Sequence, residues 1–208
     1  MAAAPALSRL ESALRAIARD LDALGRPWAL VGGLAVSART EPRFTRDIDV
    51  VVAVATDSDA ERLVRDLGAR GYRAEAIVEH EPTGRLATAR LVPAGGDEGG
   101  VVTDLLLASS GIESEVAAAA EAIEVLPRLT VPVAAVGHLV ALKILARDDS
   151  TRPQDRMDLV ALLGVVGPAD LEQARIAIGL IADRGFHRGR DLAGDLDRLL
   201  TSGAGPRP

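Results

Sequence analysis

The chain has 208 residues, 48% of them apolar, and is therefore long enough to bury a sizeable core as one folding unit. Its formal net charge of −6 argues against an extended phosphate-binding surface, because such surfaces need clustered basic side chains, although a local basic pocket stays open; its few aromatic residues offer no platform for stacking bases, and no DNA partner is expected. The absence of cysteine excludes disulfides and thiolate metal sites, and the lack of a signal sequence or of an uncharged apolar stretch of about 18 residues indicates a cytoplasmic protein without a membrane partner.

The first 134 residues predict a mixed α/β unit. Apolar residues at steps of three and four predict a helix over residues 6–24, and a short apolar run predicts a buried strand over 28–31 that ends at a glycine pair. The same patterns predict further strands over 47–54, 72–78, 86–92, 101–107, 123–126 and 129–133, and helices over 34–38, 58–69 and 111–121.

From residue 136 onward the pattern is helical. Helices are expected over 136–147, 153–163, 169–184 and 190–200, and the small and polar residues of 201–208 predict a disordered tail. We therefore expect an α/β core over 1–134, with its sheet flanked by helices, and a helical C-terminal region over 135–200 packed on that core.

Two aspartates interrupt the β-branched run of the second predicted strand. Because side chains alternate along a strand, Asp47 and Asp49 are expected to project to one side, about 7 Å apart. Neighbouring carboxylates repel one another, and Mg²⁺, which takes hard oxygen ligands, would hold them together. Asp104 interrupts a later apolar strand in the same way, so three aspartates predict a two-metal site. The alternative is structural: Asp47 pairs with Arg43 or Arg46, and Asp104 meets another arginine.

The glycine pair Gly32 and Gly33 lies where the first strand turns into a short helix. Without Cβ atoms, backbone N–H groups can approach a phosphate closely, and the dipole of a helix N-terminus favours the negative charge. A tight turn without a ligand is the alternative explanation for the pair.

Lys143 stands in the middle of an apolar helix and is the only lysine among the 24 lysine and arginine residues. A compact ammonium suits a triphosphate better than the larger arginine fork does. Alternatively, Lys143 lays its stem along the apolar face and reaches solvent. Asp155 and Asp158 share a face of the next predicted helix; the helix dipole accounts for Asp155 in the first turn better than for the deeper Asp158.

These features together resemble the polymerase-β-type nucleotidyltransferase superfamily: a Gly-Gly turn, Arg-x-Thr-x-Asp-x-Asp on the next strand and a third aspartate on a later strand. Within it, the segments "RFTRDIDVVV", "ALKILARDD" and "RPQDRMDL" are similar to the AbiEii-type toxins of bacterial toxin–antitoxin systems. The resemblance covers roughly residues 25 to 165. One departure is Gly32-Gly33, where the wider superfamily usually has Gly-Ser.

The resemblance implies a nucleotidyltransferase-type sheet and a role for each residue of the motifs. Two Mg²⁺ ions would bind to Asp47, Asp49 and Asp104, and Asp104 would also help to activate the attacking hydroxyl. The nucleotide would contact Gly32, Gly33, Arg43, Thr45 and Lys143. Of the two aspartates in the Asp-x-x-Asp-Leu motif, Asp158 is favoured as the one that supports the site.

The function implied is transfer of a nucleoside monophosphate from an NTP to a hydroxyl, with release of pyrophosphate. The acceptor would be RNA, at a tRNA 3′ end, and a partner antitoxin would reverse the resulting growth arrest. Two alternatives stay open. One is a small-molecule, antibiotic-modifying nucleotidyltransferase, which would need an acidic acceptor pocket. The other is an inactive or antitoxin-like binding member of the same fold, against which the intact aspartates and Lys143 argue.

Overall fold

The computed structural model describes residues 8–94, 100–147 and 153–204. The strands are β1 (Trp28–Val31), β2 (Ile48–Val52), β3 (Tyr72–His80), β4 (Arg85–Pro93), β5 (Thr103–Leu106), β6 (Glu121–Leu126) and β7 (Leu129–Val133). They form one seven-stranded sheet in the order β3-β4-β5-β2-β1-β7-β6. The sheet is mixed, since β2 pairs antiparallel with β1 but parallel with β5.

The two central strands explain why the chain needs long apolar runs. All four residues of β1 are buried, as are four of the five residues of β2, so both faces of the sheet are covered here. The exception in β2 is Asp49, which is partly exposed. A single polar side chain in an otherwise buried strand therefore marks the place where the sheet opens to a cavity.

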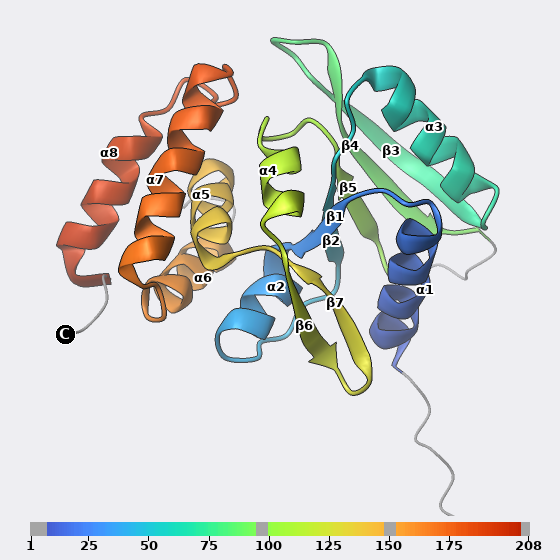
Figure 1. The fold of residues 1–208 in the computed structure, drawn as a ribbon, viewed down its shortest axis with the longest axis horizontal. Helices are drawn as coiled ribbons and strands as arrows, with labels where there is room; N and C mark the ends of the chain where they lie inside the picture. The colour runs from blue at the N-terminus through green and yellow to red at the C-terminus, as the bar shows by residue number, and fades with distance from the viewer. Residues whose placement is uncertain (1–7, 95–99, 148–152, 205–208) are drawn as a thin grey trace, which may run out of the picture.

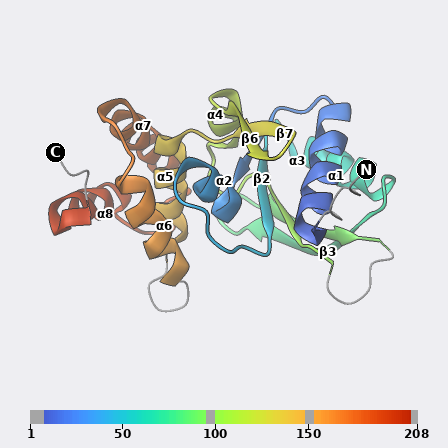
Figure 2. The ribbon, with the colours of Figure 1, turned by 90° about the horizontal axis from the view of Figure 1, so that it is seen from below.

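Helices cover both faces of the sheet (Figure 1). They are α1 (Arg9–Ala23), α2 (Gly32–Arg39), α3 (Asp57–Gly68), α4 (Glu113–Ala118), α5 (Val136–Ala146), α6 (Pro153–Leu163), α7 (Pro168–Asp183) and α8 (Leu192–Leu199). Helices α1 and α3 lie on one side, whereas α2, α4 and the C-terminal helices α5 to α8 lie on the other (Figures 1 and 2). Helix α2 contacts both α5 and α6, and one continuous cluster of buried side chains runs from Leu14 in α1 to Leu199 in α8.

Each element predicted from the sequence has a counterpart, with two differences that matter. Strand β2 begins at Ile48 rather than at Asp47, because the Ile48 N–H is bonded to the Val102 carbonyl while Asp47 precedes the ladder. The second is at the end of the chain, where Leu200–Ala204 form a π-helical turn that continues α8; the disorder predicted for the tail from residue 201 stays a prediction. Residues 205–208 lie outside the described residues. Within the described part, none of the helices has the length and apolarity of a membrane span.

Candidate active site

The site begins where β1 runs directly into α2. Gly32, the first residue of α2, has a φ of +63°, in the left-handed region where side chains are strained. A Cβ at this position would overlap the carboxylate of Asp49 on the neighbouring strand. Gly32 therefore lets the Asp49 side chain lie against the start of the helix, where backbone N–H groups and the helix dipole favour negative charge.

Asp49 and Asp104 lie side by side on parallel strands. They are direct register partners between β2 and β5, so their side chains leave the sheet on the same face. Arg90 is in turn the register partner of Asp104 on β4, and its Nε and Nη2 atoms donate to the two Asp104 oxygens at 2.9 Å each. The hydrogen bond and charge of Asp104 raise the pKa of Arg90, and the charge of Asp47 adds to this effect. The structural alternative predicted that Asp104 meets an arginine, and Arg90 is such an arginine. Asp104 nevertheless also has the carboxylate of Asp49 beside it, on the neighbouring strand.

A cavity of about 280 Å³ opens beside these carboxylates, at the low end of the size of small-molecule sites. Its lining brings together residues that are far apart in the sequence: Gly32, Asp49, Thr88, Asp104, Ser109, Ser110, Lys143, Asp155 and Arg188, with apolar residues of β1, β5 and α5. It is the candidate active site, and we refer to it as the catalytic cavity. The aspartates lie on its sheet side, and α5 and α6 supply Lys143 and Asp155 on the other.

Lys143 is held by two carboxylates of α6. Its Nζ atom lies 2.8 Å from Asp155 Oδ1 and 2.8 Å from Asp158 Oδ2, and only 13% of its side chain is exposed. The alternative of a lysine that reaches solvent is therefore wrong. Asp155 lies in the first turn of α6, where the helix dipole favours an acid, but it is only 6% exposed and also bonds to Lys143, so both aspartates of the motif contact the ammonium.

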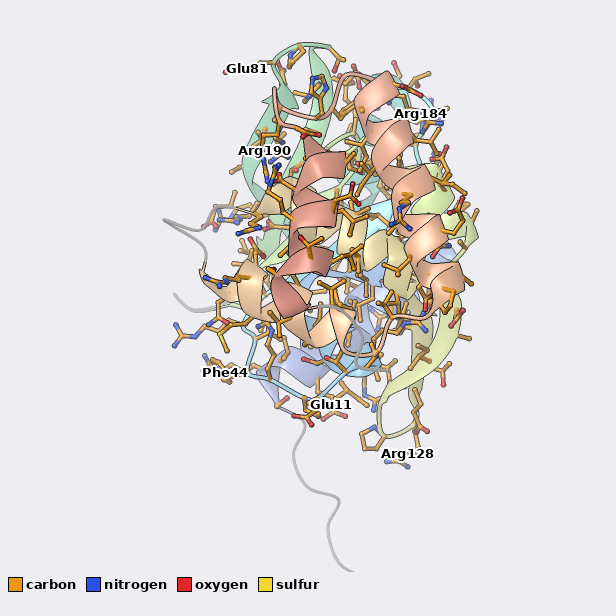
Figure 3. The ribbon with its side chains drawn as sticks, turned by 90° about the vertical axis from the view of Figure 1, so that its left-hand side faces the viewer. Glu11, Phe44, Glu81, Arg128, Arg184 and Arg190 are labelled. Carbon is orange, nitrogen blue, oxygen red and sulfur yellow. The ribbon has the colours of Figure 1, made fainter. Side chains whose placement is uncertain are left out.

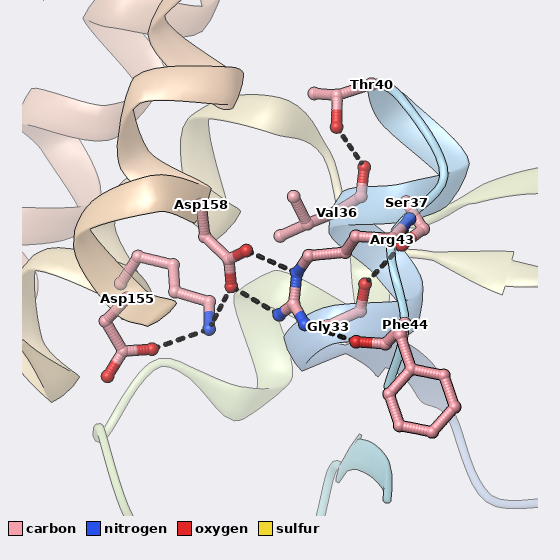
Figure 4. Close-up of polar contacts among 9 residues, drawn as sticks. Gly33, Val36, Ser37, Thr40, Arg43, Phe44, Asp155 and Asp158 are labelled. Atoms are coloured by element: carbon pink, nitrogen blue, oxygen red, sulfur yellow. Dashed lines mark hydrogen bonds and ion pairs between the residues drawn. The ribbon is translucent and has the colours of Figure 1, made fainter. Parts of the chain in front are cut away.

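Arg43 completes this cluster from the loop after α2 (Figure 4). Its Nε and Nη2 atoms donate to the two oxygens of Asp158 at 2.6 and 2.7 Å, and Asp158 is only 1% exposed. Two cations thus balance two carboxylates in a largely buried site, as buried ions require. Since Arg43 comes from the loop before β2 and Lys143 from α5, the cluster fixes the C-terminal helices against the catalytic sheet.

Gly33 lets the same loop approach α2. A Cβ at Gly33 would lie 2.7 Å from Arg43 Nη2 and 2.9 Å from Thr45 Oγ1. The Arg43 N–H also donates to Ser37 Oγ at 3.2 Å. The two glycines therefore have different neighbours: Gly32 accommodates Asp49 at the catalytic cavity, and Gly33 accommodates Arg43 and Thr45.

Asp47 and Asp49 line different cavities, and their predicted common face stays a prediction. Asp47 is exposed and lines a second cavity of about 920 Å³, together with Arg43, Thr45 and Arg46, whereas Asp49 lines the catalytic cavity. Because Asp47 precedes the β2 ladder, strand alternation does not fix its direction. Within the described ranges, no group of three or more His, Cys, Asp or Glu side chains is arranged to hold a metal ion.

Arg43 and Arg46, the arginines expected as partners of Asp47, have other contacts, as does Arg39 at the end of α2. Arg39 forms an ion pair with Glu121 at 2.6 Å, and the guanidinium of Arg46 lies 5.6 Å from the centre of the Phe44 ring. Arg43 thus fastens the loop to α6, and Arg39 fastens the end of α2 to the β6 edge.

Sequence reasoning missed several residues of the catalytic cavity. Ser109 and Ser110 follow β5 and are held by Glu113, whose Oε1 atom accepts from both backbone N–H groups at 2.8 and 2.7 Å. The Ser-x-x-Glu spacing from Ser110 to Glu113 is a helix-start signal that could have identified this turn. Arg188, in left-handed backbone with a φ of 54°, also lines the cavity, and no sequence signal indicates it. Nor does any local signal indicate that Arg90 lies opposite Asp104.

Replacing Gly32 with alanine tests the close approach of Asp49 to α2. We expect the change to lower the free energy of unfolding by about 2 kcal/mol, from the left-handed backbone and the overlap with Asp49. Displacing the carboxylate should also reduce nucleotidyl transfer about tenfold. Urea unfolding and a transfer assay measure the two effects.

Gly179 of α7 is the matched control: a Cβ there would meet open space, so alanine at this position should stabilise the protein by about 0.5 to 1 kcal/mol. A Gly32→Ala protein as stable and active as wild type would contradict this geometry.

Comparisons with known proteins agree with the geometry. A search of the curated proteins finds no significant match. Among solved structures, this chain is similar to an antigenic nucleotidyltransferase-like protein from Paracoccidioides brasiliensis. The match covers 96% of this chain and 94% of that protein, with 18% sequence identity and a TM-score of 0.53. The chain is also similar to the antibiotic-resistance factor ANT(2'')-Ia. That match covers 92% of this chain and 96% of the resistance factor, with 15% sequence identity and a TM-score of 0.50. At such identities these likenesses show the fold alone.

The profile described as "Nucleotidyl transferase AbiEii toxin, Type IV TA system" matches residues 13–204. The chain therefore belongs to the AbiEii family of nucleotidyl transferase toxins of type IV toxin–antitoxin systems.

Proposed function

We propose that the protein is a Mg²⁺-dependent nucleotidyltransferase that moves a nucleoside monophosphate from an NTP to a hydroxyl at the 3′ end of an RNA, a tRNA in particular. It would act as a toxin that a partner antitoxin neutralises. One observation carries the proposal: Asp49 and Asp104, in register on parallel strands, share a cavity with the start of α2 and with Lys143. Two carboxylates, helix N–H groups and an ammonium around one small cavity are the groups that phosphoryl transfer requires.

The oxygen donors fit magnesium. Mg²⁺ is usually held by one or two carboxylates and by phosphate oxygens of the substrate, so a preformed cluster of three carboxylates is not required. Asp49 and Asp104 would supply these ligands at the catalytic cavity, with Asp47 at the start of β2 as the third carboxylate. Bound Mg²⁺ would offset the charge that develops on the phosphate oxygens. When the cation binds, Arg90 would either keep its hydrogen bonds to Asp104 beside the cation or give them up.

The chain's own groups would bind the triphosphate and orient it. Backbone N–H groups at Gly32 and Gly33 would donate to phosphate oxygens, as helix N-termini do. Lys143 would supply a point charge from α5, while Asp155 and Asp158 hold its stem in place. Arg43 and Thr45, which lie against Gly33, would position the loop beside the nucleotide.

The reaction then requires an attack by the acceptor hydroxyl on the α-phosphorus. A new bond forms between the acceptor oxygen and that phosphorus, the bond to the bridging oxygen breaks, and pyrophosphate leaves. Asp104 is the residue we propose to receive the hydroxyl proton. Preorganised charge around the phosphates would supply most of the rate enhancement.

Thermal unfolding with nucleotide tests the binding half of the proposal. A ligand that binds only the native state adds about 2.7 kcal/mol at a hundredfold excess over Kd, so NTP with Mg²⁺ should raise the melting temperature. NTP with EDTA should raise it much less, because the carboxylates would then repel the phosphates. Equal shifts in the two conditions would count against phosphates held through a metal.

Incubation with labelled NTPs and candidate acceptors tests the acceptor. We expect label on RNA, and on tRNA most of all. Label on an aminoglycoside with none on RNA would replace the RNA acceptor by a small molecule, and no transfer to any acceptor would favour a binding member of the fold.

A further inference from the structure

A second polar cavity lies among the C-terminal helices, outside the proposed catalytic groups. It measures about 530 Å³ and is lined by Arg147, Arg156, Arg190, Asp195, Arg198, Leu199 and Ser202. We refer to it as the basic pocket. Arg190 lies on the face of the molecule formed by α7 and α8 (Figure 3). Four guanidinium groups and one carboxylate among the described lining residues are an unusual concentration in a chain whose net charge is −6.

The arginines of this pocket are arranged around that one carboxylate. Arg190 Nη2 and Arg198 Nη2 each lie 2.7 Å from an oxygen of Asp195. Burial alone would raise the pKa of Asp195, but the hydrogen bonds from Arg198 and Arg190 hold it below its ordinary value. Asp191, the nearest other carboxylate to Arg198, is 4.0 Å from its Nη1 atom and is largely exposed. Arg156 is exposed and forms no hydrogen bond or ion pair with another described residue.

Backbone carbonyls hold one of these guanidiniums in place. Arg190 Nη1 donates to the carbonyl oxygens of Leu145 at 3.2 Å and Arg147 at 3.1 Å, at the C-terminal end of α5. Since Arg190 also contacts Asp195, its side chain is fixed before any ligand arrives. A fixed arginine fork loses less conformational entropy when it binds a phosphate.

The basic pocket adjoins the catalytic cavity through three segments of chain. Residues next to one another in the sequence line the two cavities: Ala146 and Asp155 line the catalytic cavity, whereas Arg147 and Arg156 line the basic pocket. In the third segment, Arg188 lines the catalytic cavity and Arg190 lines the basic pocket. The two cavities are therefore neighbours, and the basic pocket lies within reach of a polyanion whose reactive end enters the catalytic cavity.

We propose that the basic pocket binds backbone phosphates of the acceptor RNA, close to its reacting 3′ end. The inference rests on the proposed nucleotidyl transfer and extends it to a site for the acceptor. Arginine forks match phosphate oxygens in charge and geometry. A cationic drug would be repelled at this edge of the cavity, so the pocket favours a polynucleotide acceptor over an aminoglycoside. Phosphate contacts of this kind position the strand without selecting its sequence.

Removing two of the pocket's charges should weaken RNA binding but not nucleotide binding. The test variant is Arg156→Gln/Arg198→Gln, and the control is Arg62→Gln/Arg65→Gln, which removes two exposed charges from α3 at the other end of the molecule (Figure 1). Fluorescence anisotropy with 5′-labelled tRNA, in EDTA and without NTP, gives the Kd for tRNA at several salt concentrations.

We expect the Kd for tRNA to rise at least tenfold in the pocket variant. The slope of log Kd against log salt should fall by roughly 0.7 to 0.9 for each phosphate that the variant no longer neutralises. The melting shift with Mg²⁺ and NTP should stay as in wild type.

Several results would overturn the proposal. A pocket variant that binds tRNA within twofold of wild type would do so, as would an equal loss in the α3 control, which would indicate only a general effect of charge. Arg156→Gln alone guards against loss of folding, since it breaks no ion pair between described residues. If wild type transfers nucleotide to RNA and the pocket variant binds normally, only the basic pocket is wrong. If wild type neither binds nor modifies RNA, the proposed RNA acceptor fails with it.

Discussion

Replacing Asp49 with asparagine is expected to abolish nucleotidyl transfer while the fold stays intact. The Asp49 carboxylate lies against Gly32 and beside Asp104, at the centre of the catalytic cavity. Asparagine keeps the shape that fits against Gly32 but loses the charge that a metal ligand needs. We expect kcat/KM to fall at least about 1,000-fold, equivalent to about 4 kcal/mol of transition-state stabilisation.

Stability separates this role from a structural one. Neutralising one of two adjacent carboxylates relieves their repulsion, which offsets the lost interaction with the start of α2, so the melting temperature of Asp49→Asn should equal that of wild type or exceed it slightly. Thermal unfolding and the transfer assay on the same preparation measure both effects. Asp66→Asn, an exposed aspartate of α3, is the control and should change neither. A clear loss of stability with transfer retained would assign Asp49 to the framework instead.

Lys143 is expected to be the most sensitive cationic position. Its ammonium is held by Asp155 and Asp158 at 2.8 Å and faces the catalytic cavity. Lys143→Ala should cost about a hundredfold or more in kcat/KM, or about 2.7 kcal/mol, as expected for the loss of one preorganised charge in a transfer reaction. The buried Asp158 keeps its two bonds to Arg43, so the variant should still fold.

Lys143→Arg is the sharper test because it keeps the charge. In a site where 13% of the side chain is exposed, the larger planar head cannot take the place of an ammonium between two carboxylates without displacing them. We expect at least a roughly tenfold loss in kcat/KM, since the triphosphate would be misplaced. Separate kcat and KM values for the NTP measure this. Near-wild-type transfer by the arginine variant would remove Lys143 from the site and leave the aspartates and glycines to carry it.

The sequence predicted the fold well because its apolar patterns are strong. The buried runs of β1 and β2 and the apolar helix α5 leave few alternatives, and the polar residues that interrupt them are therefore informative. Asp49, Asp104 and Lys143 each break an otherwise apolar element, and the structure gathers all three at one cavity with Gly32. A charged residue in a buried segment is costly, so such positions tend to mark function.

What the sequence could not supply depends on register and on long-range packing. Arg90 meets Asp104 only because β4 pairs with β5 in one register, which no local pattern specifies. Asp47 and Asp49 line different cavities, and strand alternation does not fix the direction of Asp47, because the β2 ladder starts one residue after it. Local pattern attributes Asp155 to the helix dipole, because nothing in the sequence shows that α6 packs against α5 with Lys143 between them.

Charge illustrates the same limit. The net charge of −6 argues against an extended phosphate-binding surface. Composition is an average over the chain, however, and it does not show where charges gather. Folding brings four arginines together in one pocket beside the catalytic cavity: Arg147 from the end of α5, Arg156 from α6, Arg190 from the loop before α8, and Arg198 from α8.

The position of the label in the NTP tests the central claim most directly. If the protein transfers a nucleoside monophosphate, RNA incubated with Mg²⁺ and an NTP labelled at the α-phosphorus becomes labelled, whereas RNA incubated with the same NTP labelled at the γ-phosphorus does not. Asp49→Asn and EDTA should each abolish the α-label, and labelled pyrophosphate should appear from the γ-labelled NTP in equal amount. Label transferred from the γ-position, or α-label that persists in Asp49→Asn, would contradict nucleotidyl transfer at this site.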